Sequence, residues 1–274
     1  MPRKRVAILR GSLERARRRV RSAATRAPSV ARSAAPAEDN PYAVMATVSD
    51  ADRRIVERAL PHTMTGAERL VAAIDAVRYC VARDVPGALV ECGVWRGGSV
   101  MAMLLALMEI GASDRDVYLY DTFEGMTAPT ERDVSHFDQP ALETWRASAG
   151  EGGRPWPWLF GEDVFDEADV RDRVLSTGYP PECLHFVRGR VEDTIPAQAP
   201  EAIALLRLDT DWYESTRHEL VHLYPRLAGG GVLIVADYGQ WQGSRQACDE
   251  YFARDALPWL LGRIDYAARM AIKH

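Results

Sequence analysis

The sequence predicts an α/β fold in which a mostly parallel β-sheet carries helices on both faces. Short apolar runs, long enough only for buried strands, alternate with longer segments whose apolar residues recur at helical spacing. Most of the apolar runs also end in an acidic residue or a glycine. Strands and helices that alternate in this way are joined by right-handed crossovers, and these produce a parallel sheet.

The first elements follow the linker "SAAPAEDNPYA". The segment 68–84, "ERLVAAIDAVRYCVARD", has apolar residues at helical spacing, and 87–93, "GALVECG", is a short apolar run into glycine. We therefore expect a helix and then a strand. Glycines open the next predicted helix, 97–111, and the apolar strand 116–121, "DVYLYD", ends in Asp121.

The alternation continues to the C-terminal region without a visible internal repeat. The remaining predicted elements are a helix over 163–176, strands over 184–189 and 203–209, a helix over 213–227, a strand over 230–237 and a helix over 243–255.

Residues 127–160 form an insert between the second strand and the next helix, and the insert is too long for an ordinary connection. Such inserts are usually lids or binding loops. Two interpretations of its aromatic side chains stay open: they stack on a sugar or a polyketide, or they form a small core of the lid itself. The aromatic residues are Phe137, Trp145, Trp156, Trp158 and Phe160.

Charge is distributed unevenly along the chain. Residues 1–33 contain eleven Lys and Arg residues against Glu14 alone, whereas the whole chain has a formal net charge of -5. We expect residues 1–40 to be a basic, disordered extension and 41–274 to form one domain. The acidity of that domain argues against nucleic acid as a partner.

The composition also limits where the protein works. No apolar run approaches the roughly 18 to 20 residues needed to cross a bilayer, so membrane insertion is not expected. The four cysteines form neither a CxxC pair nor a Cys/His spacing typical of a metal site. Reduced thiols in a cytoplasmic protein are the simplest interpretation.

Acidic residues follow five predicted strands at their carboxyl ends: Glu91, Asp121, Glu192, Asp209 and Asp237. In a parallel sheet these ends share one edge, and ligands bind there, near the point where the strand order reverses. Any one of these acids could be an ordinary residue of a surface loop. Five in succession predict a functional site.

The turn after the first strand, "ECGVWRGGSV", resembles a dinucleotide-binding loop but does not match G-x-G-x-x-G. Asp121, at the end of the second strand, suits a ribose diol because a carboxylate accepts hydrogen bonds from two neighbouring hydroxyls. A nucleoside without a pyrophosphate fits both observations. S-adenosylmethionine is the common cofactor of that description.

Six motifs occur in order from about Pro61 to the C-terminus: "PHTMTG", "ECGVWRGGSV", "YDTFEGM", "VRGRVEDTIP", "LLRLDTDWYEST" and "GGVLIVADYGQWQG". Together they resemble the macrocin O-methyltransferase family, which includes the noviose O-methyltransferases. The resemblance implies a class I methyltransferase fold with a Rossmann-like seven-stranded sheet. It also implies an S-adenosylmethionine- and metal-dependent enzyme that methylates sugar hydroxyls of natural products, and a homo-oligomer.

The resemblance also implies a cofactor site. Thr63 and Met64 are expected against the methionine end of the cofactor, and Asp121 at its ribose. The full set of cofactor residues implied is Thr63, Met64, Glu91, Gly93, Asp121, Phe123, Gly125, Val191 and Glu192.

The "DTD" stretch suggests how a sugar hydroxyl is activated. Such a hydroxyl is about as weak an acid as water, whose pKa is ~15.7, so it attacks a sulfonium methyl group poorly unless its proton is removed. If strand geometry persists, Asp209 and Asp211 point the same way, because side chains alternate with period two. We expect Asp209 to hold a hard cation such as Mg²⁺ and Asp211 to accept the proton.

Asp237 is the expected second metal ligand. Relatives in the family usually carry an Asp-Asp pair where this chain has Ala236-Asp237, so one carboxylate is lost and metal affinity should be lower. The Ala-Asp arrangement is similar to that of catechol O-methyltransferases. His136 is the next candidate for the base.

Three alternatives stay open at this point. The acceptor hydroxyl could belong to a phenol or catechol rather than to a sugar. An NAD-dependent oxidoreductase shares the predicted sheet but needs a phosphate-binding glycine pattern that "ECGVWRGG" lacks. A noncatalytic nucleoside-binding module accounts for the fold but gives no reason for the three aspartates.

Overall fold

A computed structural model describes residues 43–150, 166–253 and 260–274. The predicted basic extension over 1–40 lies outside the described residues, as do Trp156, Trp158 and Phe160 of the predicted lid. None of the described helices is long and apolar enough to span a membrane.

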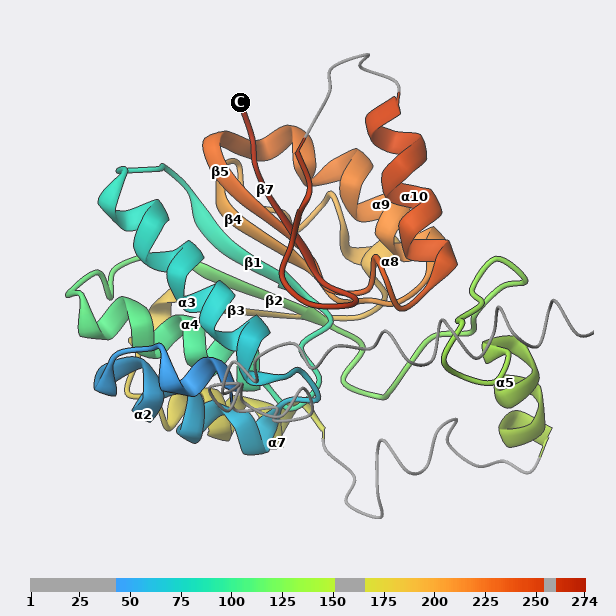
Figure 1. Cartoon of the computed structure of the whole chain (residues 1–274), viewed down its shortest axis with the longest axis horizontal. Helices are drawn as coiled ribbons and strands as arrows, with labels where there is room; N and C mark the ends of the chain where they lie inside the picture. The colour runs from blue at the N-terminus through green and yellow to red at the C-terminus, as the bar shows by residue number, and fades with distance from the viewer. Residues whose placement is uncertain (1–42, 151–165, 254–259) are drawn as a thin grey trace, which may run out of the picture. The chain divides into compact units, whose positions relative to one another are not determined.

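The core is one seven-stranded sheet in the order β3-β2-β1-β4-β5-β7-β6 (Figure 1). Strands β1 to β5 are parallel, and β7 is antiparallel to both of its neighbours, β5 and β6. This confirms the prediction of a seven-stranded, mostly parallel sheet. The strands are β1 (Ala88–Cys92), β2 (Val117–Asp121), β3 (Leu184–Arg188), β4 (Ile203–Leu208), β5 (Leu227–Val235), β6 (Gly262–Arg263) and β7 (Arg269–Ile272).

Helices cover both faces of this sheet, as predicted (Figure 1). Helices α2, α3, α4 and α7 pack together on one face, and α8, α9 and α10 pack on the other. The α-helices are α2 (Asp50–Ala59), α3 (Ala67–Ala82), α4 (Gly98–Glu109), α5 (Ala141–Gly150), α7 (Glu167–Leu175), α8 (Val191–Thr194), α9 (Tyr213–His222) and α10 (Gln242–Phe252). Short 3-10 helices are η1 (Ala43–Ala46), η2 (Leu60–His62), η3 (Pro181–Cys183) and η4 (Tyr224–Arg226).

The central strands are mostly apolar because both of their faces are covered. In β1, Leu89 belongs to the hydrophobic cluster under α2, α3 and α4, and Val90 belongs to the cluster under α9 and α10. Leu205 and Leu206 divide in the same way in β4. This alternation follows from the period of two along a strand.

Each of these two strands also contains one buried charge. Glu91 of β1 and Arg207 of β4 are register partners, and their side chains are 0 % and 1 % exposed. A lone charge in such a strand would be costly to bury. The two opposite charges instead pair with each other, with Arg207 Nη1 2.6 Å from Glu91 Oε1.

Helices α9 and α2 differ from the prediction, and α5 and α8 were not predicted either. The helix expected over 213–227 ends at His222, because Pro225 lacks the N–H that an α-helix would need there, and a 3-10 turn leads into β5 instead. Helix α2 was not predicted at all. Ser49 caps its N-terminus by accepting a hydrogen bond from Asp52 N, and Ile55 and Val56 supply its buried face.

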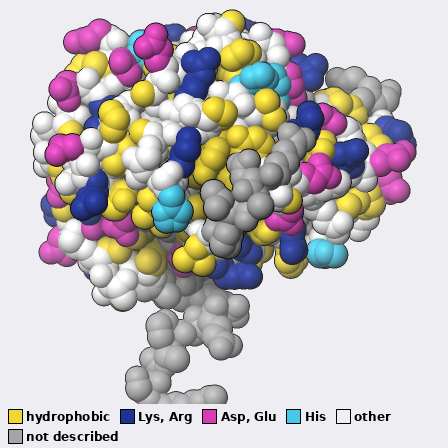
Figure 2. All heavy atoms as spheres, turned by 90° about the horizontal axis from the view of Figure 1, so that it is seen from above, with side chains coloured by type: hydrophobic (Ala, Val, Ile, Leu, Met, Phe, Trp, Pro, Cys, Tyr) yellow, Lys and Arg dark blue, Asp and Glu magenta, His cyan; other side chains and the backbone are white. Residues whose placement is uncertain are grey.

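Figure 2 shows one face of the molecule, on which acidic and basic side chains are interspersed with hydrophobic ones. Among the described residues visible there, neither sign of charge forms a continuous surface. That face therefore offers no extended positive field of the kind that attracts nucleic acid.

Candidate functional site

A cavity of about 480 Å³ opens at the carboxyl ends of the parallel strands, where the chain order reverses between β1 and β4. Open α/β sheets bind ligands at this position. Ten of the predicted site residues line the cavity: Thr63, Met64, Gly93, Asp121, Gly125, Val191, Glu192, Asp209, Asp211 and Asp237.

Two glycines of the turn after β1 allow the chain to fold closely around this cavity. Gly93 has φ +84°, and a Cβ there would lie 2.0 Å from the Asp209 carbonyl oxygen. A Cβ on Gly98 would lie 2.6 Å from the backbone of His62, immediately before Thr63 and Met64. Only glycine permits both close approaches. They bring the "PHTMTG" segment and the "DTD" stretch to one site.

Asp121 lines the cavity, and its carboxylate is already held by backbone donors. Oδ2 accepts hydrogen bonds from Val94 N at 2.7 Å and Trp95 N at 2.9 Å, and Oδ1 accepts one from Phe123 N at 2.7 Å. Burial raises the pKa of Asp121, while these N–H donors oppose the rise. The side chain therefore fixes the turn after β1 beside the loop after β2.

Two of the predicted cofactor residues lie behind the cavity wall rather than on it. Glu91 is fully buried, where it accepts hydrogen bonds from Ser99 Oγ and Arg207 Nη1. Burial raises its pKa to about 7 against the opposing charge of Arg207. Phe123 is 2 % exposed, and its ring packs against Phe186. Both residues shape the wall from behind.

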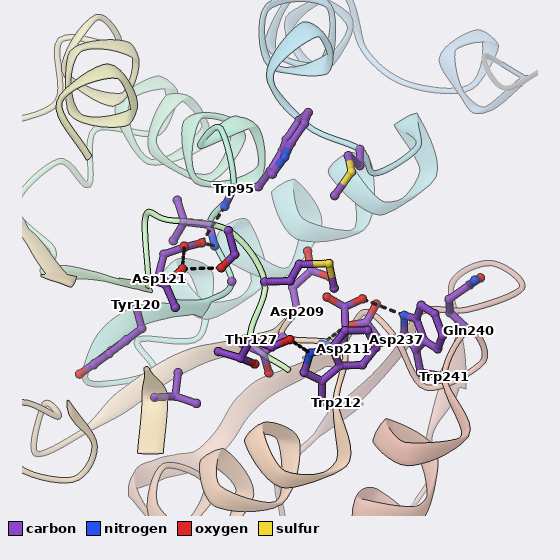
Figure 3. Close-up of a pocket in the computed structure, with 18 of the residues that line it drawn as sticks. Trp95, Tyr120, Asp121, Thr127, Asp209, Asp211, Trp212, Asp237, Gln240 and Trp241 are labelled. Carbon is purple, nitrogen blue, oxygen red and sulfur yellow. Dashed lines mark hydrogen bonds between the residues drawn. The ribbon is translucent and has the colours of Figure 1, made fainter. Parts of the chain in front are cut away.

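Asp209, Asp211 and Asp237 converge on the other side of the cavity (Figure 3). The expected reason for the convergence was wrong, because β4 ends at Leu208 and Asp211 has a left-handed backbone with φ 68°. Strand alternation therefore does not bring Asp209 and Asp211 together; a tight turn does. Asp237 lies two residues beyond β5, and its Oδ2 accepts a hydrogen bond from Asp211 N at 3.2 Å.

The three acids repel one another in a buried setting. Burial and the charge of Asp209 raise the pKa of Asp211 to about 7. The pKa of Asp237 rises well above its ordinary value because of burial and the charges of Asp211 and Asp209. Such a site favours a proton, a cation or a positively charged ligand.

Two arginines that were not predicted as site residues partly offset this negative charge. Arg207 bridges Glu91 and Asp209, with Nη1 2.7 Å from Asp209 Oδ2. Arg69 lines the cavity and pairs with Asp265, Nε to Oδ2 2.6 Å. Burial opposes the charge of Arg69, but Asp265, Asp209 and Asp237 raise its pKa. The sequence signal that could have identified Arg207 was an arginine inside the apolar run "LLRLD".

Two tryptophans that were not predicted as site residues lie beside the acids. Trp241 Nε1 donates a hydrogen bond to Asp211 Oδ1 at 2.8 Å. Trp212 Nε1 donates to the Thr127 carbonyl oxygen at 2.9 Å, and the two indoles meet edge to face at 5.0 Å. Both side chains line the cavity. The hydrogen bond to Thr127 thus connects the start of the insert to the segment that carries the acids.

His136 does not line the cavity. Its side chain is exposed, with Nε2 3.2 Å from Gln242 Nε2. The described part of the lid is instead anchored by Asp133, which is fully buried and accepts hydrogen bonds from Tyr213 N and Thr130 N, each at 2.7 Å. His136 is therefore in a poor position to act as the base.

The acidic side chains of this site offer only oxygen atoms as ligands for a metal ion. No group of three or more His, Cys, Asp or Glu side chains in the described ranges is arranged to hold a metal ion. A cation here would rest on fewer carboxylates than three, and Asp209 has one oxygen engaged by Arg207. Mg²⁺ is commonly held in this way, by one or two carboxylates together with water and substrate.

Comparisons with known proteins identify the family of this chain. The sequence model described as macrocin O-methyltransferase (TylF) matches residues 5–149 and 162–271. Demethyldecarbamoylnovobiocin O-methyltransferase of Streptomyces niveus is 33 % identical over 193 residues, covering 70 % of this chain and 68 % of that protein. A tetracenomycin 4'-O-methyltransferase of Streptomyces olivaceus, whose name specifies a rhamnosyl substrate, is 34 % identical over 79 % of this chain and 78 % of its own.

Solved structures give the same result. The O-methyltransferase NovP superposes with a TM-score of 0.64 at 31 % identity, covering 77 % of this chain and 82 % of its own. Calicheamicin methyltransferase CalS11 shares the fold, with a TM-score of 0.56 at 20 % identity over 85 % of this chain and 93 % of its own. S-adenosylmethionine is the methyl donor that this fold implies. The chain belongs to the macrocin O-methyltransferase family and is an O-methyltransferase.

Proposed function

We propose that this enzyme transfers the methyl group of S-adenosylmethionine to a hydroxyl of a sugar attached to a natural product, with the help of a divalent cation. The observation that carries the proposal is the convergence of Asp209, Asp211 and Asp237 in the cavity that also contains Asp121 and Gly93. One side of the cavity then binds the cofactor, and the other side activates the acceptor.

The methyl transfer itself needs no covalent enzyme intermediate. The acceptor oxygen attacks the methyl carbon, the carbon–sulfur bond breaks, and its electron pair stays on sulfur to give S-adenosylhomocysteine. The hydroxyl proton goes to Asp211, and burial raises the pKa of this carboxyl, which makes it a stronger base than an ordinary aspartate. Trp241 orients Asp211 by donating to its Oδ1.

Asp209 and Asp237 are the residues that would hold the cation. The crowding of buried negative charge around Asp237 favours a positive ion, and carboxylate oxygens suit Mg²⁺. Bound there, a divalent cation would lower the pKa of the acceptor hydroxyl. Because Ala236 stands beside Asp237 and Arg207 engages Asp209, we expect the cation to be held weakly.

The chemistry of the site favours a sugar over a phenol. A phenol loses its proton at a pKa of about 10, whereas an alcohol is about as weak an acid as water and needs more assistance. A cluster of three acids offers that assistance. The rhamnosyl substrate in the name of the Streptomyces olivaceus relative supports the same choice.

The charge of the cavity supports a sugar attached to a neutral natural product rather than to a nucleotide. A nucleoside diphosphate would bring negative charge to a cavity already lined by Asp121, Asp209, Asp211, Asp237 and Glu192. The arginines of the wall are engaged: Arg69 pairs with Asp265, and Arg190 pairs with Glu192. An anionic acceptor would be repelled.

The test is a methyl-transfer assay followed by mass spectrometry. Purified enzyme is incubated with S-adenosylmethionine and a panel of natural-product glycosides that lack one methyl group, their sugar-free aglycones, catechol and dTDP-rhamnose. We expect methylation of a glycoside alone, abolished by EDTA and restored by Mg²⁺. Methylation of catechol or an aglycone in place of every glycoside would contradict the sugar assignment, and full activity after EDTA treatment would contradict the cation.

We also infer that the enzyme works in the cytoplasm as a homo-oligomer. All four cysteines are free in the structure, as expected in a reducing compartment. Light scattering on the purified protein measures the mass of the assembly. A mass equal to one chain would contradict the oligomer.

A further inference from the structure

Glu219 is a buried acid that has no part in the chemistry described so far. It lies on α9 with 0 % of its surface exposed, and it does not line the cavity. Burial and the nearby charges of Glu192 and Asp209 raise its pKa well above the ordinary value. A buried acid of this kind needs a structural or functional reason.

Its hydrogen bond points to that reason. Thr210 Oγ1 donates to Glu219 Oε1 at 2.9 Å, and Thr210 is the residue between Asp209 and Asp211. The Thr210 carbonyl oxygen accepts two more bonds, from Trp212 N at 2.7 Å and from Ser215 Oγ at 3.2 Å. The backbone of Thr210 is therefore fixed to the start of α9, and its side chain to Glu219 further along the same helix.

This anchoring matters because the next residue is strained. Asp211 has φ 68°, a left-handed conformation that is unfavourable for a residue other than glycine and persists only when its surroundings enforce it. On the cavity side, Trp241 holds the Asp211 carboxylate. On the opposite side, Thr210 and Glu219 hold the backbone.

We propose that Glu219 is a positioning residue: through Thr210 it enforces the turn that places the Asp211 carboxylate against Trp241 at the cavity. The inference rests on the proposed role of Asp211 as base. Glu219 touches neither substrate nor cofactor in this account. Its role is that of a hydrogen-bond acceptor for Thr210 Oγ1.

The indole N–H of Trp241 gives a direct readout that needs no acceptor. Because it donates to Asp211 Oδ1, its ¹⁵N–¹H resonance reports where that carboxylate lies. The chain has seven tryptophans, and Trp241→Phe assigns the resonance by removing it. Trp212→Phe is a matched control, because that indole donates to the Thr127 carbonyl oxygen instead.

The variants separate the hydrogen bond from simple packing. Thr210→Val keeps the size of the side chain and removes the donor, whereas Thr210→Ser keeps the donor. Glu219→Gln keeps an uncharged acceptor, and Glu219→Leu removes it. We expect Thr210→Val and Glu219→Leu to move the Trp241 resonance upfield and leave the Trp212 resonance in place, while Thr210→Ser and Glu219→Gln leave both in place.

Turnover should distinguish the same two groups of variants. With the glycoside that the panel above identifies, Thr210→Val should lower turnover about tenfold, the factor that one hydrogen bond supplies. KM and the affinity for S-adenosylmethionine should stay within about twofold, and Thr210→Ser should have near wild-type turnover. Thr210→Val combined with Glu219→Leu should be no worse than the more impaired single variant, because the pair acts as a unit.

An unmoved Trp241 resonance in a folded Thr210→Val protein would overturn the proposal. A lower melting temperature of Thr210→Val with unchanged turnover would also overturn it. If Glu219→Leu does not fold, the Thr210 pair of variants decides alone. Asp211→Asn separates the two proposals. If Asp211→Asn has normal turnover, the assignment of the base is wrong; if it is inactive and Thr210→Val is normal, only the role of Glu219 is wrong.

Discussion

The acids at the ends of β1 and β2 and the acids that follow β4 and β5 share one edge of the sheet but are stabilised in opposite ways. Asp121 is surrounded by backbone N–H groups of its own turns, and Glu91 is paired with Arg207. Asp211 and Asp237 instead face each other and Asp209, which raises their pKa values. Both oxygens of Asp121 accept hydrogen bonds and Glu91 has a cationic partner before any ligand arrives, whereas the second group is left with an excess of negative charge.

This difference indicates a division of labour. Carboxylates with fixed partners keep a rigid turn in place, which suits binding of a cofactor. Carboxylates that repel one another hold protons and cations more readily, which suits removal of a proton from an acceptor.

Asp211→Asn should have the largest effect. It keeps the size of the side chain and removes the base, so turnover should fall by ~10² to 10⁴, the usual contribution of a positioned proton acceptor. Steady-state kinetics at saturating cofactor and Mg²⁺ measure this. His136→Asn is the control, and a greater loss in it than in Asp211→Asn would transfer the role of base to the lid.

Asp209→Asn should weaken the cation site. Its affinity for Mg²⁺ should fall by at least the roughly 10- to 100-fold that loss of an outer-shell partner costs, so activity should recover partly at high Mg²⁺. Titration of activity with Mg²⁺ measures the shift. Asp211→Asn should not recover, and equal rescue of both variants would make both residues ligands and leave the base unassigned.

Asp121→Ala should act on the cofactor side alone. Removal of the carboxylate should weaken S-adenosylmethionine binding by ~1.5 to 3 kcal/mol, the range for hydrogen bonds that involve a charged group. Asp116→Ala is the control, because Asp116 precedes the opposite end of β2 and pairs with His185. Unchanged affinity in Asp121→Ala would place the ribose elsewhere.

Glu91→Gln should have the smallest effect, on the pH dependence of stability. The folded-state pKa of Glu91, about 7, lies above its ordinary value of 4.5, so the folded protein binds the extra proton between these pH values. Wild type should therefore lose stability relative to Glu91→Gln as the pH rises from about 4.5 to 7. Urea unfolding at several pH values measures this difference. A constant difference would mean that Glu91 is ionised throughout.

The sequence pattern was sufficient for the five parallel strands and for the position of the site, whereas β6 and β7 were not predicted as elements. Buried parallel strands leave apolar runs, and the acids after those runs reach one edge wherever the strands are parallel. Asp121 consequently lines the cavity as expected, and so does Met64, which only the family resemblance implied. Helix α2 was missed because its sequence, "DADRRIVERA", is mostly charged and its buried residues are few.

The partners of the acids could not be predicted. Arg207 and Glu91 are 116 residues apart in the sequence, and Trp241 and Asp211 are 30 apart. Local periodicity therefore predicts neither contact. The left-handed turn at Asp211 is imposed by contacts with α9 and with Asp237, against the preference of an aspartate in a strand-like sequence. Local patterns give the elements, whereas the charge environment of a site depends on register between elements.

The most direct test of the division of labour is calorimetric titration of S-adenosylmethionine into Asp211→Asn and Asp121→Ala, with turnover of both measured on the same preparations. We expect each variant to lose one of these two properties and to keep the other. Asp211→Asn should bind the cofactor within about twofold of wild type and be almost inactive, and Asp121→Ala should bind weakly yet regain most of its turnover at saturating cofactor. Loss of cofactor binding in Asp211→Asn, or full turnover by it, would contradict the separation of the two sides.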